Sequence, residues 1–266
     1  MAQRKRSEFL SPSCINQFYY SLEDFYRNYI LRRPRMKQTP AQGLGSAFDA
    51  HVKWEIRNRL GKENVVFPFR SFKHCYESQV AKHLNLMEPS EKIFRGYVDS
   101  GMFDRIMEHP NHGKLIKCTM EVLVTADVDG VIVGGYPDFL GLYEDNTRII
   151  LDWKVNGYYS ARRVSTGKGP VYVCGDTTGR EKLLSETDYN STGWGVQLGI
   201  YNLCTNIRIG MIHQFAFNGI DSCRYAEFYG KISTDGLDEK IKRVNEQLHA
   251  FTALDEDEKR FVELMG

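Results

Sequence analysis

The 266-residue sequence lacks several features that would assign it to particular classes of protein. It has no run of about 18 consecutive apolar residues, so we predict no membrane-spanning helix. Its basic opening, Met1 to Arg6, is not followed by an apolar stretch, so we expect no signal peptide and a cytoplasmic protein with reduced thiols. The net charge of +1 excludes a basic surface over the whole molecule and leaves local patches to contact any nucleic acid.

Motifs for structural zinc and for nucleotide binding are also missing. The six cysteines, at positions 14, 75, 118, 174, 204 and 223, include no Cys-x-x-Cys pair, so the sequence predicts no zinc ribbon. The triplet Gly167-Lys168-Gly169 lacks the Gly-x-x-x-x-Gly-Lys-Ser/Thr frame of a phosphate-binding loop. We therefore expect no ATPase or helicase activity from this chain.

The spacing of apolar residues divides the chain into a helical first part and a sheet-forming middle. Steps of three and four residues predict helices over 13–31, 44–60, 76–86 and 237–251, and another that begins at Trp194; 93–107 is ambiguous. Alternation and turn residues predict an antiparallel meander of strands over 121–127, 131–143 and 148–155, then two strands over 211–218 and 224–232. We expect a single domain, with a helical part over 13–118 and a long loop or insertion over 156–193.

Two carboxylates stand at corresponding places on adjacent strands of this meander. Pro137-Asp138 and Asp152-Trp153-Lys154 flank the predicted turn at 144–146, so strand pairing brings Asp138 and Asp152 side by side. Neighbouring carboxylates repel, and a hard divalent cation such as Mg²⁺ relieves that repulsion. Because side chains alternate along a strand, Lys154 shares the face of Asp152 and Trp153 faces the other way.

Asp-x-Lys on a strand is also a common surface pattern, so the residues around it have to distinguish a catalytic site from an exposed one. Asp152 follows the apolar run Ile149-Ile150-Leu151, which is typical of a strand covered on both faces. A carboxylate in such a strand should be paired or bound to metal. A metal and a lysine together provide the Lewis acid, positioned water and charge neutralisation that phosphodiester hydrolysis requires.

Gly135-Tyr136-Pro137-Asp138, Asp152-Trp153-Lys154 and Gln197-Leu198-Gly199-Ile200-Tyr201 together resemble the RecB-like branch of the PD-(D/E)XK nuclease superfamily. That family carries a Gly-x-x-Asp strand, a (D/E)-x-Lys strand and a Gln-x-x-x-Tyr helix in this order. The resemblance spans about residues 13–217. It implies an α+β, restriction-endonuclease-like fold with a mixed central β-sheet flanked by α-helices. Gln197 and Tyr201 are four residues apart and share a helix face, where they would contact substrate phosphate or brace the site.

This chain departs from the pattern of that family at the first metal ligand. The family has an upstream helix with Gly-x-x-x-His, whose histidine binds metal, whereas this chain has Gly45-Ser46-Ala47-Phe48-Asp49, with His51 two residues later. Asp49 matches the ligand by position and His51 by residue type. The two lie about 200° apart on a helix and are not expected to face one metal, and we favour Asp49. Glu121 resembles an acidic residue that some members carry on the preceding strand, or is an exposed residue at the start of a strand.

The resemblance implies a Mg²⁺- or Mn²⁺-dependent deoxyribonuclease, more readily an exonuclease in recombination, repair or phage replication. Asp138, Asp152, Asp49 or His51 and the backbone carbonyl of Trp153 would bind metal, and Lys154 would position water. A clamp on the DNA strand is expected from Arg162, Arg163 and Lys168. Some members carry a four-cysteine iron–sulfur cluster; Cys14 matches its first ligand but the later cysteines are too sparse, so we predict no cluster.

Two alternatives remain open at this point. One is a structure-specific endonuclease on the same fold, and the other is a DNA-binding recombination accessory protein with a degenerate site. The expected partners are DNA and a recombination or replication protein. The sequence does not report the oligomeric state.

Overall fold

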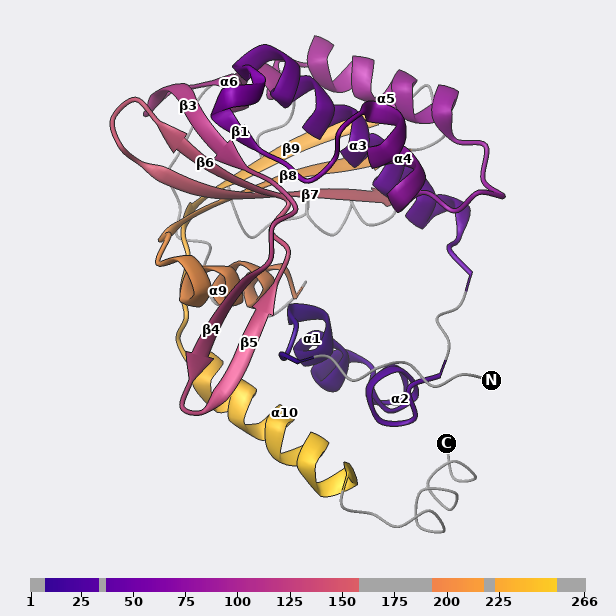
Figure 1. The fold of residues 1–266 in the computed structure, drawn as a ribbon, viewed down its shortest axis with the longest axis vertical. Helices are drawn as coiled ribbons and strands as arrows, with labels where there is room; N and C mark the ends of the chain where they lie inside the picture. Colours follow the sequence, from indigo (N-terminus) through magenta and orange to yellow (C-terminus); the bar gives the residue numbers. More distant parts are fainter. Residues whose placement is uncertain (1–7, 34–36, 158–192, 218–222, 253–266) are drawn as a thin grey trace.

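The computed structural model describes residues 8–33, 37–157, 193–217 and 223–252, and its centre is a mixed β-sheet. Along the sheet the strands follow the order β1-β3-β6-β7-β8-β9, and β2 pairs with β3 (Figure 1). Their bounds are β1 Val65–Val66, β2 Glu108–His109, β3 Gly113–Thr119, β6 Phe139–Tyr143, β7 Arg148–Gly157, β8 Ile209–Phe217 and β9 Cys223–Lys231. The β1–β3 and β7–β8 pairs are parallel and the others antiparallel. The predicted α+β architecture, a mixed central sheet flanked by helices, is confirmed.

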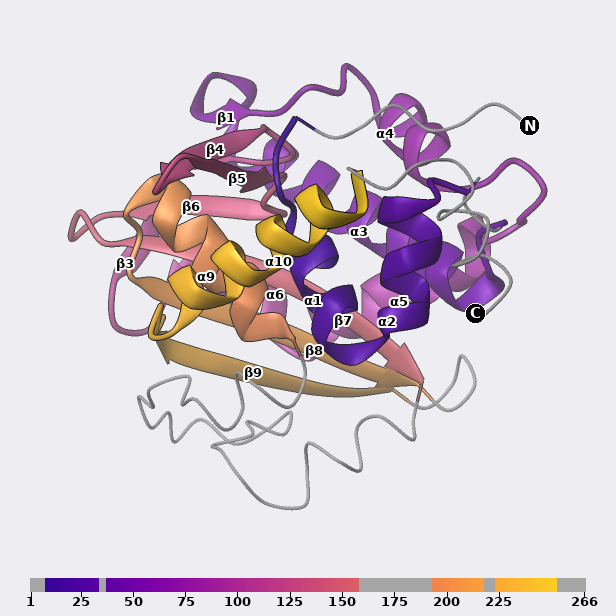
Figure 2. The ribbon, with the colours of Figure 1, turned by 90° about the horizontal axis from the view of Figure 1, so that it is seen from below.

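Helices cover both faces of the sheet and define two hydrophobic cores (Figures 1 and 2). One core lies beneath α3 Pro40–Leu60, α5 Met87–Asp99 and α6 Met102–Met107, and α4 Phe72–Gln79 packs on α3. The other lies against α9 Trp194–Thr205, with α1 Pro12–Tyr20 and α10 Leu237–Thr252 beyond it. Strand β7 serves both, because Ile149 and Leu151 point into the first core and Ile150 into the second. All three are 0% exposed, so the strand is covered on both faces as predicted.

Helix α3 begins four residues earlier than the apolar spacing predicted. The side chain of Thr39 accepts a hydrogen bond from the backbone of Gln42, whose side chain accepts one from the Thr39 backbone, and Pro40 occupies the first turn. The helix ends before Gly61, whose φ of +87° suits glycine, at the predicted stop. This start was missed because the prediction followed apolar residues and not caps.

The prediction of a single helix over residues 13–31 is wrong, because the helix is interrupted at Ser21. This residue adopts φ −154° and ψ 84°, which ends α1. Its hydroxyl then accepts a hydrogen bond from the backbone N–H of Asp24 and donates one to the Asp24 carboxylate at 2.9 Å. A new helix α2 Leu22–Phe25 starts there and continues as the π-helical turn η1 Tyr26–Ile30. A serine that caps the next helix competes with helix continuation.

The predicted meander divides into two sheets. Strands β4 Val124–Val128 and β5 Val131–Gly135 form a separate hairpin around the expected Asp127–Gly130 turn. The strand predicted over residues 131–143 is interrupted at Pro137, and β6 starts only at Phe139. Proline cannot donate a hydrogen bond to a strand ladder, which explains the interruption. The partner of β6 on its other side is β3, which the sequence did not predict.

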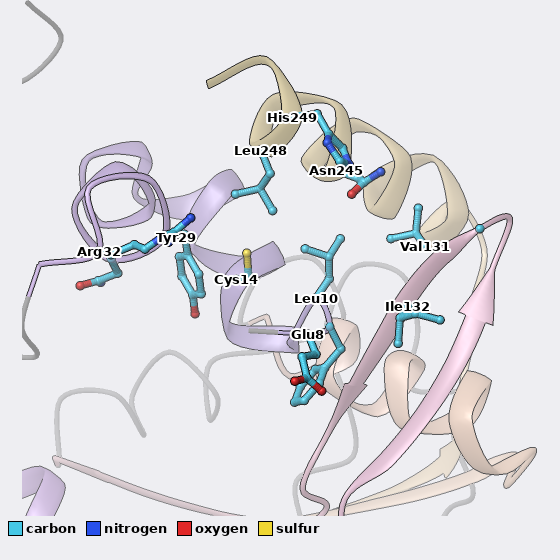
Figure 3. A pocket seen from close by; sticks show the side chains of 13 residues that line it. Glu8, Leu10, Cys14, Tyr29, Arg32, Val131, Ile132, Asn245, Leu248 and His249 are labelled. Atoms are coloured by element: carbon cyan, nitrogen blue, oxygen red, sulfur yellow. The ribbon is translucent and has the colours of Figure 1, made fainter. Parts of the chain in front are cut away.

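A cavity of about 590 Å³ lies between the N-terminal helices, the β4–β5 hairpin and α10 (Figure 3). Its lining includes Leu10, Cys14, Arg32, Val131 and His249. None of the site residues predicted from the sequence lines it. In the part of the chain that the structure describes, no helix is long and apolar enough to cross a membrane.

Candidate active site

Strands β6 and β7 bring Asp138 and Asp152 together. Asp138 directly precedes β6, and the register that pairs Phe139 with Leu151 puts it next to Asp152. The backbone N–H of Trp153 donates to the Asp138 carboxylate at 3.3 Å. Asp152 is only 1% exposed, in the middle of the sheet. The expected pairing across the turn near residue 145 is therefore what the structure has.

A single amide on α9 joins the two polar residues of β7. Gln197 donates from Nε2 to Asp152 at 2.6 Å, and its Oε1 accepts a hydrogen bond from Lys154 Nζ at 2.7 Å. Lys154 also forms an ion pair with Asp152. Gln197 thus fixes the carboxylate and the ammonium relative to each other, because both point to the face that α9 covers.

Tyr201, one turn after Gln197, ties α9 to the segment that carries Asp138. Its hydroxyl donates to the backbone carbonyl of Tyr136 at 3.1 Å. A Cβ on Gly135 would lie 3.0 Å from the Tyr201 ring, so this close approach favours glycine. The Gly-x-x-Asp and Gln-x-x-x-Tyr patterns therefore meet in space: the glycine of one makes room for the tyrosine of the other.

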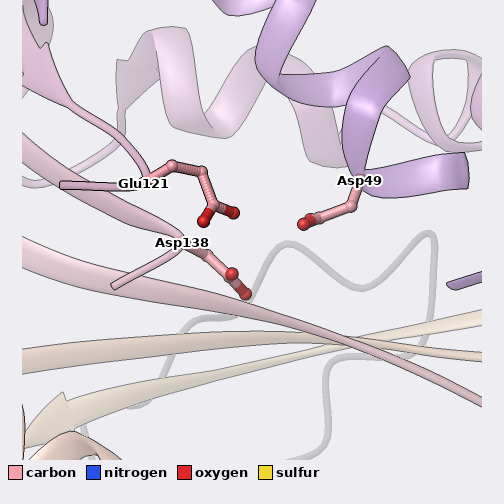
Figure 4. A group of neighbouring side chains, drawn as sticks. All are labelled: Asp49, Glu121 and Asp138. Carbon is pink, nitrogen blue, oxygen red and sulfur yellow. The ribbon is translucent and has the colours of Figure 1, made fainter. Parts of the chain in front are cut away.

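Three further side chains complete what we call the acidic cluster. Asp49 on α3 and Glu121, after the end of β3, point toward Asp138 (Figure 4). One carboxylate oxygen from each lies within 4.8 Å of the others. The ammonium of Lys53 contacts all three carboxylates, with 3.1 Å to Asp138, and its side chain is 0% exposed. The acidic cluster comprises Asp49, Lys53, Glu121, Asp138, Asp152 and Lys154.

Glu121 reaches the cluster through an uncommon backbone conformation. Its φ is +56°, in the left-handed region that non-glycine residues seldom adopt. Its N–H donates to the carbonyl of Pro137 at 3.1 Å, which fastens this kink to the segment before Asp138. Such strain is concentrated at functional sites, where the surrounding structure maintains it. The side chain is 22% exposed, so Glu121 is not simply a surface residue at the start of a strand.

His51 lies away from the acidic cluster. Its Nε2 is 3.2 Å from the Ser90 hydroxyl, and its ring packs against Phe72 and Phe94, with centroids at 4.7 and 5.6 Å. Burial lowers the pKa of His51. Helix α3 thus sends Asp49 toward the sheet and His51 toward α4 and α5, as expected of residues about 200° apart. The substrate-binding candidates Arg162, Arg163 and Lys168, and most of the predicted 156–193 loop, lie outside the described residues.

The acidic cluster holds more negative than positive charge. Burial raises the pKa of Asp152 to about 7, and the neighbouring Asp138 adds to that effect while Lys154 opposes it. Burial likewise raises the pKa of Asp49 well above its ordinary value, against the pull of Lys53. The pKa of Asp138 is lowered despite its burial, because Lys53 and Lys154 both face it. Two lysines do not neutralise four carboxylates.

The donor set suits a hard divalent cation. Mg²⁺ and Mn²⁺ prefer carboxylate, carbonyl and water oxygens. Asp49 Oδ1 is buried and has no hydrogen-bond partner among the described residues. Asp152 Oδ2 accepts no hydrogen bond from them either and has only the ion pair with Lys154. A buried carboxylate oxygen without a hydrogen bond is costly unless a cation binds it, so these residues fit a metal ion.

Trp153 faces the opposite core, where it ends a chain of hydrogen bonds. Its indole N–H donates to the Tyr97 hydroxyl at 3.2 Å, and that hydroxyl lies 2.6 Å from Nδ1 of His213. Nε2 of His213 is 3.0 Å from Glu227, which also binds Arg105 through two nitrogens. We call these five residues the Tyr97 network. Glu227 in this network is only 1% exposed, and its carboxylate is paired with the guanidinium of Arg105.

The sequence interpretation missed Lys53 and the Tyr97 network. The i, i+4 spacing of Asp49 and Lys53 was a usable signal, since such residues are neighbours on a helix. That pattern is common on exposed helix surfaces, and only the packing of α3 on the sheet buries this one. The five residues of the Tyr97 network come from five separate elements, so no local spacing indicates it.

Comparisons with known proteins give no family for this chain. No family model matches it, and no curated protein matches its sequence. Among solved structures, a protein from Eubacterium rectale provisionally named an exonuclease aligns with a TM-score of 0.47 and 14% identity, over 92% of this chain and 80% of that one. A protein named SSO0001 aligns with a TM-score of 0.30 and 12% identity, over 85% and 81% of the two chains. Function has to be inferred from the residues of the site.

Proposed function

We propose that the chain is a Mg²⁺- or Mn²⁺-dependent deoxyribonuclease of the RecB-like PD-(D/E)XK type, with its active site at the acidic cluster. The observation that carries this proposal is the surplus of carboxylates around Asp138 and Asp152, together with the buried Oδ1 of Asp49, which has no hydrogen-bond partner among the described residues. Two lysines alone would leave this arrangement unfavourable, whereas a divalent cation stabilises it. Three motifs of that superfamily supply the residues, in the superfamily's order.

In this proposal Asp49, Asp138 and Asp152 hold the metal, with the backbone carbonyl of Trp153 as a further ligand. His51 is set aside because its ring packs against Phe72 and Phe94. The bound ion would supply Lewis-acid polarisation of the scissile phosphate and lower the pKa of a water molecule. Lys154 orients the attacking water and offsets charge that develops on the phosphate.

The α9 residues act on Lys154 and on the strand ends. Gln197 holds the Lys154 ammonium beside Asp152, so it keeps the water-positioning group in register with the metal ligand. Tyr201 fixes the turn before Asp138 through the Tyr136 carbonyl. Arg162, Arg163 and Lys168 remain proposed contacts for the DNA backbone, because their charges suit phosphate.

The direct test is hydrolysis of linear double- and single-stranded DNA in Mn²⁺ and in Mg²⁺. Asp152→Ala removes a proposed metal ligand and Lys154→Ala the water-positioning group, so each should reduce the rate by at least about a hundredfold. The matched control is Asp104→Asn, which changes an exposed carboxylate whose partner is Arg59 and should leave the rate unchanged. Full activity of both alanine variants would overturn the proposal.

The same assay separates exonuclease from endonuclease action. We propose an exonuclease, which requires a DNA end and should leave covalently closed circles intact. Cleavage of closed or nicked circles at internal positions would instead indicate the structure-specific endonuclease.

A DNA-binding accessory protein with a degenerate site is the second candidate. The observation that favours it is Lys53, which already fills the space between three of the four carboxylates. Calorimetric titration with Mn²⁺ distinguishes the two, since a degenerate site would release no heat of binding. DNA binding without Mn²⁺ binding or hydrolysis would support the accessory role.

A further inference from the structure

Lys53 is unusual because its charge is fully buried and surrounded by acids. Its ammonium contacts Asp49, Glu121 and Asp138, and no part of its side chain is exposed. Neither the conserved motifs of the proposed nuclease nor its chemistry requires a lysine at this place on the helix. Its position needs an explanation of its own, since a buried ammonium is stable only when it is paired.

The three carboxylates around Lys53 are also the group whose spacing would hold a metal ion. A divalent cation bound to all three carboxylates would contact the same oxygens that the Lys53 ammonium already contacts. Two cations at one set of oxygens repel strongly in a site that is mostly removed from water. Lys53 and a metal ion therefore exclude each other at Asp49, Glu121 and Asp138 taken together.

The surroundings keep Lys53 in place. Its stem passes through the core beneath α3, and its Nζ lies 5.7 Å from the centre of the Trp153 ring. Neighbouring α3 residues Phe48, Val52 and Ile56 are each 0% exposed, so the helix has no room to tilt that lysine toward solvent. A side chain in such packing does not swing out when an ion arrives.

The charges of the acidic cluster then match one divalent ion. When all four carboxyl groups are ionised, as metal ligands are, they and the two ammonium groups leave two negative charges, which a single Mg²⁺ or Mn²⁺ neutralises. Asp49 Oδ1, which has no hydrogen-bond partner in the described part of the chain, is separate from Oδ2, which contacts Lys53, so Asp49 can contact both cations at once. A second divalent ion would leave the site with excess positive charge.

We propose that Lys53 is a built-in cation that occupies the second cation position of the site, so that the protein binds one divalent ion where other carboxylate-rich sites bind two. This inference rests on the proposed function, because it assumes that Asp138 and Asp152 bind metal. Lys53 is here a specificity-determining residue for the number of ions.

The test is the stoichiometry of Mn²⁺ binding measured by calorimetry on the full chain. The wild type should bind one ion, and Lys53→Ala, which opens the space and removes a positive charge, should bind two. Lys154→Ala is the matched control, since it removes the same charge from the same cluster but leaves Lys53 in its position, and it should still bind one ion. One ion in Lys53→Ala, or two in Lys154→Ala, would overturn the inference.

Electron paramagnetic resonance of the wild type gives a second measurement that does not depend on a variant folding. Two Mn²⁺ ions about 3.5–4 Å apart, as in two-metal sites, couple magnetically and broaden the spectrum. We expect the resolved six-line spectrum of an isolated ion at saturating Mn²⁺. A coupled pair in the wild type would refute the role of Lys53 while leaving the nuclease proposal intact. No bound Mn²⁺ at all would refute both.

Discussion

Strand β7 contributes residues to two polar clusters that differ in how completely their side chains are paired. In the Tyr97 network, the hydrogen bonds run from the Trp153 indole to Glu227, and the one carboxylate meets the guanidinium of Arg105. In the acidic cluster, buried oxygens of Asp49 and Asp152 lack hydrogen-bond partners among the described residues. Burial does not distinguish the carboxylates of Glu227 and Asp152, since both residues are 1% exposed.

The pKa values of these two carboxyl groups express the difference. Although burial alone would raise it, hydrogen bonds from His213 and Arg105 lower the pKa of Glu227 to about 2. Burial raises the pKa of Asp152 to about 7, and Lys154 does not compensate for it. The partners of Glu227 favour its charged form enough to outweigh burial, whereas those of Asp152 do not, and an external cation would favour its charged form. This contrast separates a structural network from a candidate functional site.

Glu227→Gln should have the largest effect on stability, because it breaks the paired cluster. It removes the buried carboxylate that binds Arg105 and His213, and removal of one member of a buried ion pair costs about 3–5 kcal/mol. Urea unfolding of the metal-free protein measures this loss. Glu55→Gln, at an exposed pair with Arg59, is the control and should cost less than about 1 kcal/mol. Equal losses in the two variants would show that the Tyr97 network contributes no more than a surface pair.

Asp152→Asn should raise the stability of the metal-free protein, whereas Glu227→Gln lowers it, and the size of the gain should depend on pH. The folded-state pKa of Asp152, about 7, lies above the ordinary aspartate pKa of 3.8, so between these pH values the folded protein binds a proton that the unfolded chain does not. Metal-free wild type should therefore lose stability as pH rises from about 4 to 7, by at most about 4 kcal/mol for a shift of three pKa units. Asparagine cannot ionise, and the variant should lack this part of the decline.

Glu227 provides the contrast in sign within the same titration. Its folded-state pKa of about 2 lies below the ordinary glutamate pKa of 4.5, so the stabilisation it contributes is complete above pH 4.5 and is lost as the pH falls toward 2. Unfolding of wild type, Asp152→Asn and Glu227→Gln across pH 3–8 tests both. An unchanged slope between pH 4 and 7 in Asp152→Asn would refute the raised pKa of Asp152.

The sequence was sufficient for those parts of the fold and site that depend on local pattern. The apolar run before Asp152 correctly predicted a strand covered on both faces, and the turn near residue 145 correctly placed Asp138 beside it. The positions of Asp49 and His51 on one helix predicted that they face different ways. Strand and helix periodicity carry this information within a few residues, so it can be read without the rest of the chain.

What the sequence missed depends on contacts between distant segments. The break at Ser21 arises because a serine can cap the next helix, yet the apolar residues around it continue the helical spacing. Strand β3 was missed because its sequence does not alternate apolar and polar residues. Leu115 and Ile116 are adjacent apolar residues, although Leu115 is buried and Ile116 is 39% exposed. The burial of Lys53 depends on α3 packing over Glu121, 68 residues later. Such features follow from tertiary packing, which overrides local pattern.

Trp153 joins the two clusters, which makes Tyr97→Phe the smallest but most discriminating prediction. The Trp153 indole binds the Tyr97 hydroxyl, while its backbone N–H binds Asp138 in the acidic cluster. Loss of that hydroxyl leaves buried hydrogen-bonding groups unpaired and should cost about 1–3 kcal/mol in urea unfolding. If the network also positions β7, Mn²⁺ affinity measured by calorimetry should weaken, by less than about tenfold because the effect passes through Trp153.

The matched control for this prediction is Tyr143→Phe. The Tyr143 hydroxyl is also buried and donates to the Ile106 carbonyl at 3.1 Å, but it does not bind Trp153. Its loss should lower stability by a similar amount and leave Mn²⁺ affinity unchanged. Equal Mn²⁺ affinities in the two variants would mean that the Tyr97 network stabilises the fold without positioning the metal ligands. A weaker Mn²⁺ affinity in Tyr97→Phe alone would mean that the Tyr97 network positions the acidic cluster through Trp153.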